Sequence, residues 1–381
     1  MLTISYQNRR AVQIENQRLR LTVLEGGGHI AGLQHKPTGV NPLWIPPWPS
    51  IEPSTYDPAL HPEYGNDSES KLLAGIMGHN LCLDTFGGPS AEEAAAGMTV
   101  HGEAPVVRHR IAESAGGLIV SADLPEAQLA FERRIRLEGP WVRISETVEN
   151  LSALDRPVAW TEHVTIGPPF LACGDTLVDM PATRAKVNPA SYSDAMMITP
   201  DADFQWPQAP LQGGGFHDLR TTPDGCYLRY TAQLLDPSRA MGYTAIANPS
   251  AGLLLVYVFR RTDFPWVGNW EERFYLKTAP WGGKTFCRGI EFSSTPLAVP
   301  KRQTVSQGPL FNESTYRWLP ALSETTVRYM TLLVDIPADF QGVEDVSVEA
   351  ARIVIREAGN GKTYSLPADG SFLRGEAAGL R

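Results

Sequence analysis

The chain has 381 residues, of which 43% are hydrophobic and 20% are charged, and its formal net charge is −9. This composition is typical of a globular protein with a sizeable core and excludes general disorder. The charge is acidic and no basic stripe interrupts it, which argues against nucleic acid as a partner. No window reaches the roughly 18 apolar residues of a membrane span, and the first residues resemble a polar strand rather than a secretory signal.

Four cysteines are spread along the chain without a CxxC pair. They are Cys82, Cys173, Cys226 and Cys287. This spacing argues against a structural zinc site and favours reduced, mostly buried thiols. Together with the absence of a predicted signal or membrane segment, it leads us to expect a cytoplasmic protein.

Short alternating or apolar runs recur between turn signals, which predicts strands rather than helices. The runs cover residues 11–16, 19–25, 104–114, 117–124, 127–139, 141–150, 158–167, 225–234, 252–261, 284–293 and 325–336. Between residues 104 and 167 the connections are tight, as in an antiparallel meander. No alternation of strands with helices appears. We therefore predict a mainly β, antiparallel architecture.

Helical signals are few. They occur at residues 68–77 and at residues 90–97, where Ser90 is a suitable N-cap. The segment 343–359 is equally compatible with a helix and with a strand. No convincing linker is visible, so we predict one domain over residues 1–357, followed by a loosely held tail over residues 358–381.

Three long irregular segments are rich in proline, glycine and aromatic residues. They cover residues 37–67, 180–224 and 277–283 with its neighbours. On a β scaffold, long loops of this kind tend to form the lids and walls of a site.

His163 lies in the predicted strand AWTEHVTI, directly before a Gly-Pro-Pro stop. Because side chains alternate along a strand, His163 shares the more polar face with Thr161 and Thr165, while Trp160 points to the opposite face and is expected in the core. A histidine in this position can fill a core, hold a metal or transfer a proton. Other motifs in the sequence are needed to distinguish between these three roles.

Other candidates lie on either side of this strand. The segment GIMGHNLCLDTFGG holds His79, Asn80 and Asp84 between glycines that permit tight turns. His101-Gly102 comes just before another strand, and Glu291 interrupts an apolar strand in FCRGIEFSSTP. A glutamate inside such a strand must be paired, neutralised or used.

These residues are compatible with metal ligation or with general acid/base chemistry. The best metal fragment is His101-x-Glu103, which on a strand would present both side chains on one face and resembles part of a cupin site. A cupin needs a second histidine two positions after the first, and the sequence has none there. Neither an HExxH motif nor a pair of cysteines supplies another ligand set. We therefore expect no metal and favour acid/base chemistry.

The order of the motifs resembles the aldose 1-epimerase family of the galactose mutarotase-like superfamily. An early strand reads LTVLEGGGHIAGLQH, TVHG contains His101, TEHVTIGPPF contains His163, and FCRGIEFSSTP contains Glu291. The resemblance covers about residues 12–299. It implies an antiparallel β-supersandwich with a sugar-binding cleft on the concave face of one sheet.

The resemblance also implies a function, an isomerase that interconverts the anomers of a small carbohydrate without a cofactor. Glu291 would be the base, His163 the proton donor and His101 an orienting or charge-stabilising group. His79, Asn80 and Asp84 would contact the sugar. A carbohydrate-binding protein that has lost turnover remains an alternative. A glycosidase or lyase on the same fold is less favoured, because no second strand carboxylate pairs obviously with Glu291.

Aromatic residues near these motifs can be interpreted in two ways. Trp266 and Trp270 lie four residues apart in RRTDFPWVGNWEERF, and Trp44 and Trp48 lie in PLWIPPWPS. An indole stacks well on the apolar C–H face of a sugar, but it also anchors a loop to a core. The sequence leaves both roles open, as it does the identity of the sugar and the oligomeric state.

Overall fold

A computed structural model describes residues 1–189 and 197–375. The larger of its two main sheets has 12 strands in the described part of the chain. Its strands are, in spatial order, β1 (Leu2–Tyr6), β2 (Arg9–Glu15), β3 (Leu19–Leu24), β4 (Ile30–His35), β5 (His79–Asp84), β10 (Arg156–Ile166), β20 (Phe286–Ser293), β19 (Trp266–Arg273), β16 (Tyr227–Leu235), β12 (Ala182–Val187) and β13 (Asp203–Gln205), with β21 (Arg317–Leu319) beside β10.

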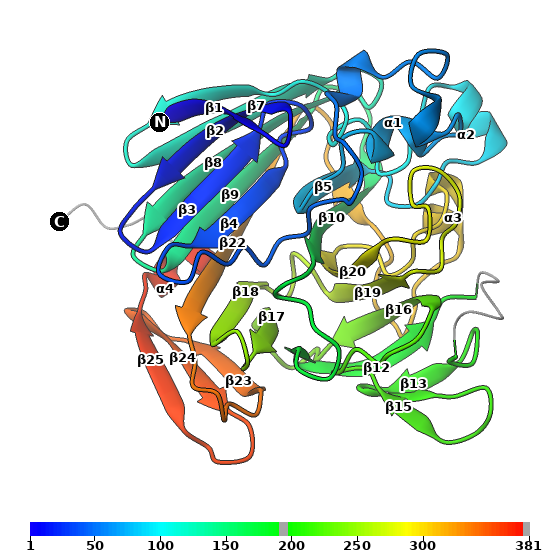
Figure 1. Cartoon of the computed structure of the whole chain (residues 1–381). Helices are drawn as coiled ribbons and strands as arrows, with labels where there is room; N and C mark the ends of the chain where they lie inside the picture. The colour runs from blue at the N-terminus through cyan, green and yellow to red at the C-terminus, as the bar shows by residue number, and fades with distance from the viewer. Residues whose placement is uncertain (190–196, 376–381) are drawn as a thin grey trace.

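The second main sheet has eight strands in the described residues and faces the first (Figure 1). Its strands are, in spatial order, β11 (Leu177–Asp179), β17 (Met241–Asn248), β18 (Leu253–Arg260), β22 (Glu324–Asp335), β9 (Trp141–Asn150), β8 (Leu129–Glu138), β7 (Gly117–Leu124) and β6 (Arg110–Ser114). Neighbouring strands pair antiparallel in both sheets. The prediction of a mainly β, antiparallel sandwich is confirmed.

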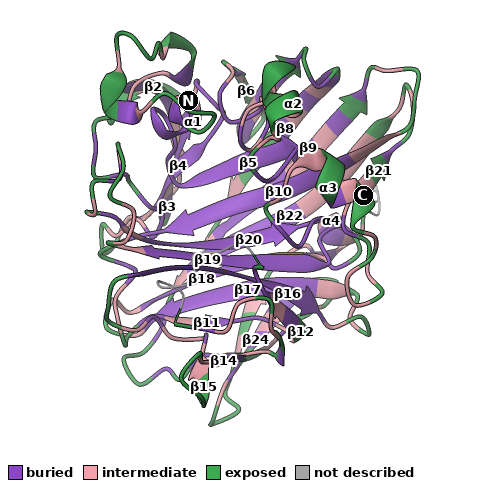
Figure 2. Cartoon of the chain, turned by 90° about the vertical axis from the view of Figure 1, so that its right-hand side faces the viewer, coloured by how far each residue is buried: buried purple, intermediate pink, exposed green. Residues whose placement is uncertain are grey.

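The main core lies between the two sheets. Trp160 of β10 and Phe292 of β20 pack there against residues of β18, and the rings of Phe292 and Phe259 stack with centroids 4.5 Å apart. Trp160 therefore has the core position that strand alternation predicts. Strands β5, β10, β20 and β19 are buried along most of their length (Figure 2). Both faces of this central part are thus covered, one by the second sheet and the other by loops.

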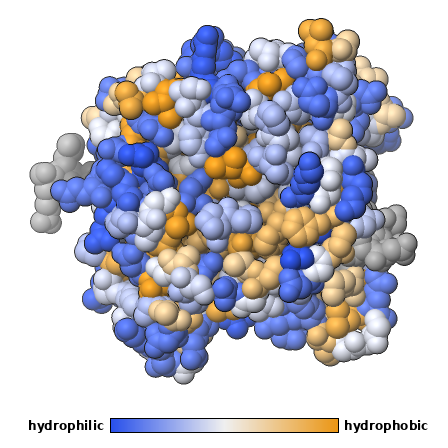
Figure 3. All heavy atoms as spheres, in the orientation of Figure 1, coloured by the Kyte–Doolittle hydropathy of each residue, from blue (hydrophilic) through white to orange (hydrophobic). Residues whose placement is uncertain are grey.

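Two smaller sheets complete the β structure. They are β14 (Gln208–Pro210) with β15 (Phe216–Asp218), and the three-stranded sheet β23 (Val343–Val348), β24 (Arg352–Glu357) and β25 (Thr363–Pro367). The three-stranded sheet packs apolar side chains such as Val346, Ile353 and Ile355 against the outer face of the second main sheet. The face seen in Figure 3 carries hydrophilic side chains together with apolar groups near its middle.

The C-terminal segment differs from the loosely held tail that the sequence suggested. Residues 363–367 form β25, which pairs with β24, and Leu373 of the following helix is fully buried. The sequence does not predict this strand, because β25 alternates exposed and partly buried positions and is therefore polar in composition. Residues 376–381 lie outside the described part of the chain. The ambiguous segment 343–359 forms strands β23 and β24.

The helices are short. They are α1 (Ser70–Leu73), α2 (Ala91–Ala95), α3 (Lys301–Ser306), α4 (Gly370–Arg374) and the 3₁₀ turns η1 (Pro53–Thr55) and η2 (Pro62–Tyr64). The predicted helices at residues 68–77 and 90–97 are present as α1 and α2. Ser90 caps α2 in a capping box with Glu93. Among the described residues, no helix is long and apolar enough to cross a membrane.

The long segments have different positions. Residues 37–67 run with η1, η2 and α1 over the outer face of the first sheet, where Trp44, Trp48 and Trp281 share an apolar cluster with residues of α1. The segment 180–224 contains β12, β13, β14 and β15, and its residues 190–196 lie outside the described part of the chain. The loop at residues 277–283 supplies Trp281.

Candidate functional site

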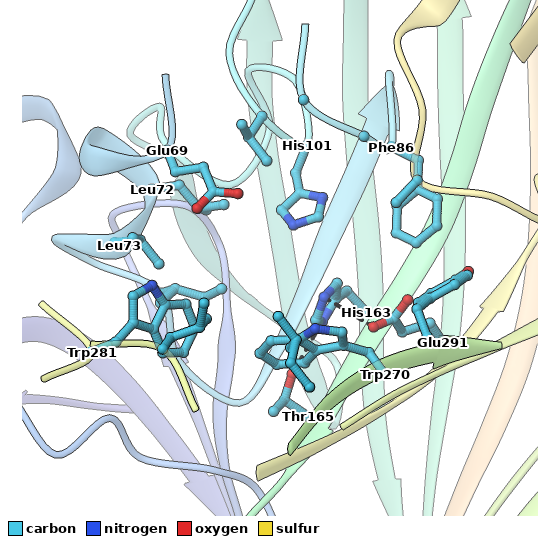
Figure 4. A pocket seen from close by; sticks show the side chains of 18 of the residues that line it. Glu69, Leu72, Leu73, Phe86, His101, His163, Thr165, Trp270, Trp281 and Glu291 are labelled. Carbon is cyan, nitrogen blue, oxygen red and sulfur yellow. Dashed lines mark hydrogen bonds and ion pairs between the residues drawn. The ribbon is translucent and has the colours of Figure 1, made fainter. Parts of the chain in front are cut away.

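A pocket of about 270 Å³ lies on the outer face of the first sheet, above β10, β19 and β20. His163 and Glu291 project from its floor, His101 lies in a loop above them, and Trp270 and Trp281 form one side (Figure 4). The site therefore combines three strand residues, His163, Glu291 and Trp270, with His101 and Trp281 from two loops. The sheet fixes the floor, whereas the loops determine the shape of the entrance.

The pair at the floor follows from strand register. His163 of β10 lies directly opposite Glu291 of β20, so both side chains leave the sheet on the same face. Nε2 of His163 is 3.1 Å from Oε1 of Glu291. Nδ1 of the same ring is 3.0 Å from the hydroxyl of Thr165, two residues along the same face. The imidazole is thus held at both nitrogens.

Glu291 has hydrogen-bonding capacity to spare. Its Oε2 atom is buried without a protein partner among the described residues. Burial raises the pKa of Glu291 from its ordinary 4.5 to about 8. Burial, and then the adjacent His101, lower the pKa of His163 well below its usual range. At neutral pH the resting proton of the pair therefore lies on Glu291, and His163 is neutral.

Two glycines make room for the Glu291 carboxyl group. A Cβ atom at Gly289 would collide with Oε1 of Glu291, and one at Gly268, opposite Glu291 on β19, would lie 2.8 Å from Oε2. A glycine inside a strand often marks such a close approach. The sequence contains this signal as Gly289-x-Glu291, with the glycine two residues before the glutamate.

His101 lies in a turn and not on a strand. Its φ is 65°, in the left-handed region, and its ring centroid lies 5.0 Å from that of His163. Burial lowers the pKa of His101 to about 4. Glu103 points elsewhere, because its Oε2 accepts a hydrogen bond from Ala127 N at 2.7 Å and it lines a separate hollow. His101 and Glu103 thus lack the shared strand face that the disfavoured metal hypothesis would need, because His101 lies in a left-handed turn.

Three tryptophans form an aromatic wall along the pocket. The rings of Trp44 and Trp281 stack with centroids 6.3 Å apart, and Trp270 contacts Trp281 edge-on at 5.9 Å. Trp270 also lies 6.3 Å from the ring of His163. The wall thus extends from the His163–Glu291 pair to the loop clusters. Trp281 was missed in the sequence, although its loop had been recognised as a potential site wall.

Four predicted contact residues lie outside the pocket lining. His79 points between the sheets, and Trp266 is fully buried and donates from its indole to Ser314 O at 2.8 Å. Asp84 forms ion pairs with Arg156 and Lys301 in the second hollow, which has a volume of about 180 Å³.

Asn80 is the fourth of these residues and shares the face of His163, which lies opposite it in register on β10. It is fully buried, and its nearest hydrogen-bond partner is Cys82 Sγ at 3.8 Å. Asn80 thus lies beneath the pocket surface rather than on it.

His79 belongs to a polar network in the sandwich interior. Its Nε2 lies 2.8 Å from Glu162, and Arg133 joins Glu162 to Glu146, with Arg133–Glu146 at 2.6 Å. The hydroxyl of Tyr329 reaches both carboxylates at 2.9 and 3.0 Å. In this network both carboxylates are satisfied by buried donors, whereas Nδ1 of His79 has no partner among the described residues.

The arrangement of antiparallel sheets defines the class of fold as the β-sandwich of the galactose mutarotase-like proteins. Sequence comparison alone matches the chain to no family description and to no curated protein. Solved structures match it clearly. A candidate aldose 1-epimerase from Klebsiella pneumoniae superposes with a TM-score of 0.63 at 13% identity, over 87% of this chain and 81% of that one.

Two further structures support the same fold. The galactose mutarotase related enzyme from Lactobacillus acidophilus gives a TM-score of 0.56 at 12% identity, over 86% of this chain and 98% of that one. A candidate aldose 1-epimerase from Escherichia coli gives 0.57 at 11% identity, over 86% and 99%. At such low identity the likeness establishes the fold, and the chemistry has to be argued from the side chains.

Proposed function

We propose that the protein is an aldose 1-epimerase-like isomerase, which interconverts the anomers of a reducing sugar. The observation that carries this proposal is the His163–Glu291 pair, with Nε2 and Oε1 at 3.1 Å on the floor of a pocket and Oε2 of Glu291 without a partner. The names of the structural neighbours point to the same chemistry. Buried free thiols at Cys82 and Cys287 are compatible with our proposal of a cytoplasmic location.

The reaction needs one base and one acid. The base removes the proton of the anomeric hydroxyl while the acid protonates the ring oxygen. The bond between the anomeric carbon and the ring oxygen then breaks, and an aldehyde forms. Rotation about the neighbouring bond and the reverse proton transfers close the ring on the other face. The acid/base pair thus begins and ends with one proton, and no electrons are exchanged.

His163 and Glu291 together hold the one proton that the reaction needs. In the resting pair, Glu291 carries the proton and His163 accepts from it. A sugar hydroxyl that donates to the vacant Oε2 stabilises the carboxylate form, since hydrogen bonds to a charged group favour that form. The proton then moves across the 3.1 Å contact to His163. This leaves Glu291 as the base through Oε2 and His163 as the acid, whose Nε2 proton passes from its contact with Oε1 to the ring oxygen.

The neighbours of the pair suit a positioning role. His101 is buried and neutral at working pH, and its Nδ1 has no protein partner among the described residues, so it can form a hydrogen bond with a sugar oxygen. Trp270 offers its indole face beside His163. Sugars present apolar C–H faces to such rings, which orients the anomeric carbon towards the pair.

The test is to follow anomer ratios by proton NMR. Pure anomers of several aldoses are mixed with the protein, and the relaxation rate is compared with that in buffer and with the Glu291→Gln variant at equal concentration. The proposal predicts faster relaxation only with the intact pair. Calorimetric binding of an aldose whose anomers relax at the buffer rate would instead identify a carbohydrate-binding protein.

A further inference from the structure

The pocket has a polar end and an apolar end. His101, His163 and Glu291 gather at one end, whereas Leu73 and Trp281 lie at the other, beyond Trp270 (Figure 4). Most lining side chains at the apolar end are aromatic or aliphatic. They are Trp44, Leu72, Leu73, Ile76, Leu276 and Trp281. Glu69 lies beside Leu72 at this end (Figure 4), so a sugar that reaches from the pair to this end meets one carboxylate among otherwise mainly apolar surfaces.

The hydroxyl group of Tyr230 in the lining already forms a hydrogen bond within the protein. Tyr230 donates to the carbonyl of Pro296 at 2.8 Å. A buried hydroxyl without a partner loses its hydrogen bonds to water and gains none, which is unfavourable, whereas a methyl group in the same place gains from burial. The part of this end that Leu73 and Trp281 form, away from Glu69, therefore selects against a hydroxymethyl group.

The charges of the lining exclude anionic sugars. Among the described residues that line the pocket there is no lysine and no arginine. Its second carboxylate, Glu69, lines the pocket beside Leu72 (Figure 4), and burial raises the pKa of this group. A phosphate or carboxylate substituent would find no cation to pair with in the lining and would be repelled by Glu69.

We infer that the substrate is an uncharged reducing sugar with an apolar substituent, of which a 6-deoxyhexose is the simplest form. This inference rests on the proposed function. The anomeric hydroxyl must be free, so the substituent is not on the anomeric carbon. In a hexopyranose the exocyclic group is on the carbon next to the ring oxygen. When the ring oxygen and the anomeric oxygen meet His163 and Glu291, that group extends from the pair towards Leu73 and Trp281.

The experiment uses matched pairs of sugars. D-Galactose, D-glucose and D-mannose are each compared with their 6-deoxy counterparts, and galactose 6-phosphate and galacturonate represent the anions. We expect the 6-deoxy member of the accepted pair to have a kcat/KM at least about tenfold higher, as when one unpaired buried hydroxyl is removed. Equal rates within every pair, or a preference for either anion, would overturn the inference.

A variant locates the preference in the pocket. Leu73→Asn places a polar group of similar size at the apolar end and is expected to reduce the ratio of the two kcat/KM values severalfold. Leu373→Asn is the matched control, because Leu373 is also a buried leucine on a short helix but lies beneath the three-stranded sheet. Its ratio should equal that of the unchanged protein. Since both sugars are measured in one sample, loss of folded protein cancels in this ratio.

Calorimetry with the same sugars separates the two proposals. Tenfold tighter binding of a 6-deoxyhexose without any acceleration of its anomer exchange would refute the isomerase and retain the substrate class. Fast exchange of ordinary hexoses without a 6-deoxy preference would retain the isomerase and refute the substrate class. Failure to bind any of the six neutral sugars would also refute the substrate class.

Discussion

Strand β10 carries two adjacent residues, Glu162 and His163, which point to opposite faces of the sheet. Each of them is one member of a glutamate–histidine pair. On the inner face Glu162 lies 2.8 Å from His79, and on the outer face His163 lies 3.1 Å from Glu291. Both pairs are buried. In the inner pair Glu162 also contacts Arg133, whereas Oε2 of Glu291 has no partner in the described residues and faces a pocket.

This difference shows that proximity of a histidine and a glutamate does not by itself create a reactive site. Both oxygens of Glu162 in the inner pair already accept hydrogen bonds from enclosed groups, so this pair stabilises the joint between the sheets. The outer pair retains one unused acceptor and an adjacent space. A ligand can complete the outer pair but cannot reach the inner one.

The largest expected effect comes from breaking the inner network. Arg133→Met leaves the carboxylates of Glu146 and Glu162 without their cation, which is expected to lower the free energy of unfolding by about 3–5 kcal/mol. Urea denaturation measures this change. Arg110→Met is the control, because the Arg110–Asp123 pair is exposed and its loss should change the free energy of unfolding far less. Equal effects of the two changes would show that the inner network is not a stabilising element.

Breaking the outer pair should affect turnover instead. Glu291→Gln and His163→Asn are each expected to lower kcat by at least about a hundredfold, the usual contribution of a positioned acid or base. Sugar affinity should change much less, because shape and most contacts remain. Glu162→Gln is the counterpart on the inner face, and it should reduce stability while the folded fraction keeps its kcat. Anomer exchange by NMR and thermal melts of the same samples test both halves of this prediction.

Replacing each of the two tryptophans of β19 should give a smaller effect, and it should again separate a change in ligand binding from a change in stability. Trp270→Ala removes part of the pocket wall and should weaken sugar binding by about 1–3 kcal/mol, as expected for a lost aromatic contact. Trp266→Ala should destabilise the fold and leave the affinity of the folded protein unchanged, because Trp266 is fully buried outside the lining. Isothermal calorimetry distinguishes them, and an affinity loss confined to Trp266→Ala would contradict the assignment of the wall.

The outer pair also predicts a pH dependence. Turnover needs one shared proton, so activity should be level at neutral pH and fall as pH rises through about 8, the pKa of Glu291. The same raised pKa predicts a pH dependence of stability. Because the pKa of Glu291 lies above the ordinary 4.5, the folded state keeps the proton up to a higher pH than the unfolded state does. The contribution of Glu291 to the free energy of unfolding is therefore full below pH 4.5 and declines up to about pH 8. Glu291→Gln should remove this decline, which denaturation of both proteins across that range will measure.

The smallest expected effect is that of a chelator. The proposed proton transfers use only His163, Glu291 and the sugar, so dialysis against EDTA should leave anomer exchange unchanged. A loss of activity that is restored by one divalent metal would contradict the metal-free chemistry and reopen the role of His101.

Much of this architecture was predictable because strand periodicity is a local property. The alternation around His163 correctly separated its face from that of Trp160, and Ser90 correctly marked the start of α2. Partners across strands are a different matter. The sequence cannot show that His163 lies opposite Glu291, because register depends on pairing between segments far apart in the chain.

The same limit explains the residues that were misjudged. His79 and His163 both lie on predicted strands, and only the second sheet makes the face of His79 an interior one. Trp266 and Trp270 are four residues apart on one strand, yet the chain around Ser314 covers the first. Gly268 and Gly289 revealed their role only when the carboxyl group of Glu291 was seen between them.

The alternation of Glu162 and His163 along β10 has a consequence for how such a protein can diverge. Insertion or deletion of a single residue within β10 would rotate every later side chain to the other face, sending a carboxylate into the pocket and an imidazole into the interior. Length changes in this strand would therefore remove the site and the joint between the sheets at once. Loops such as residues 277–283 have no such constraint. Related proteins should consequently acquire new ligands through loops of different length, while the spacing along β10 remains fixed.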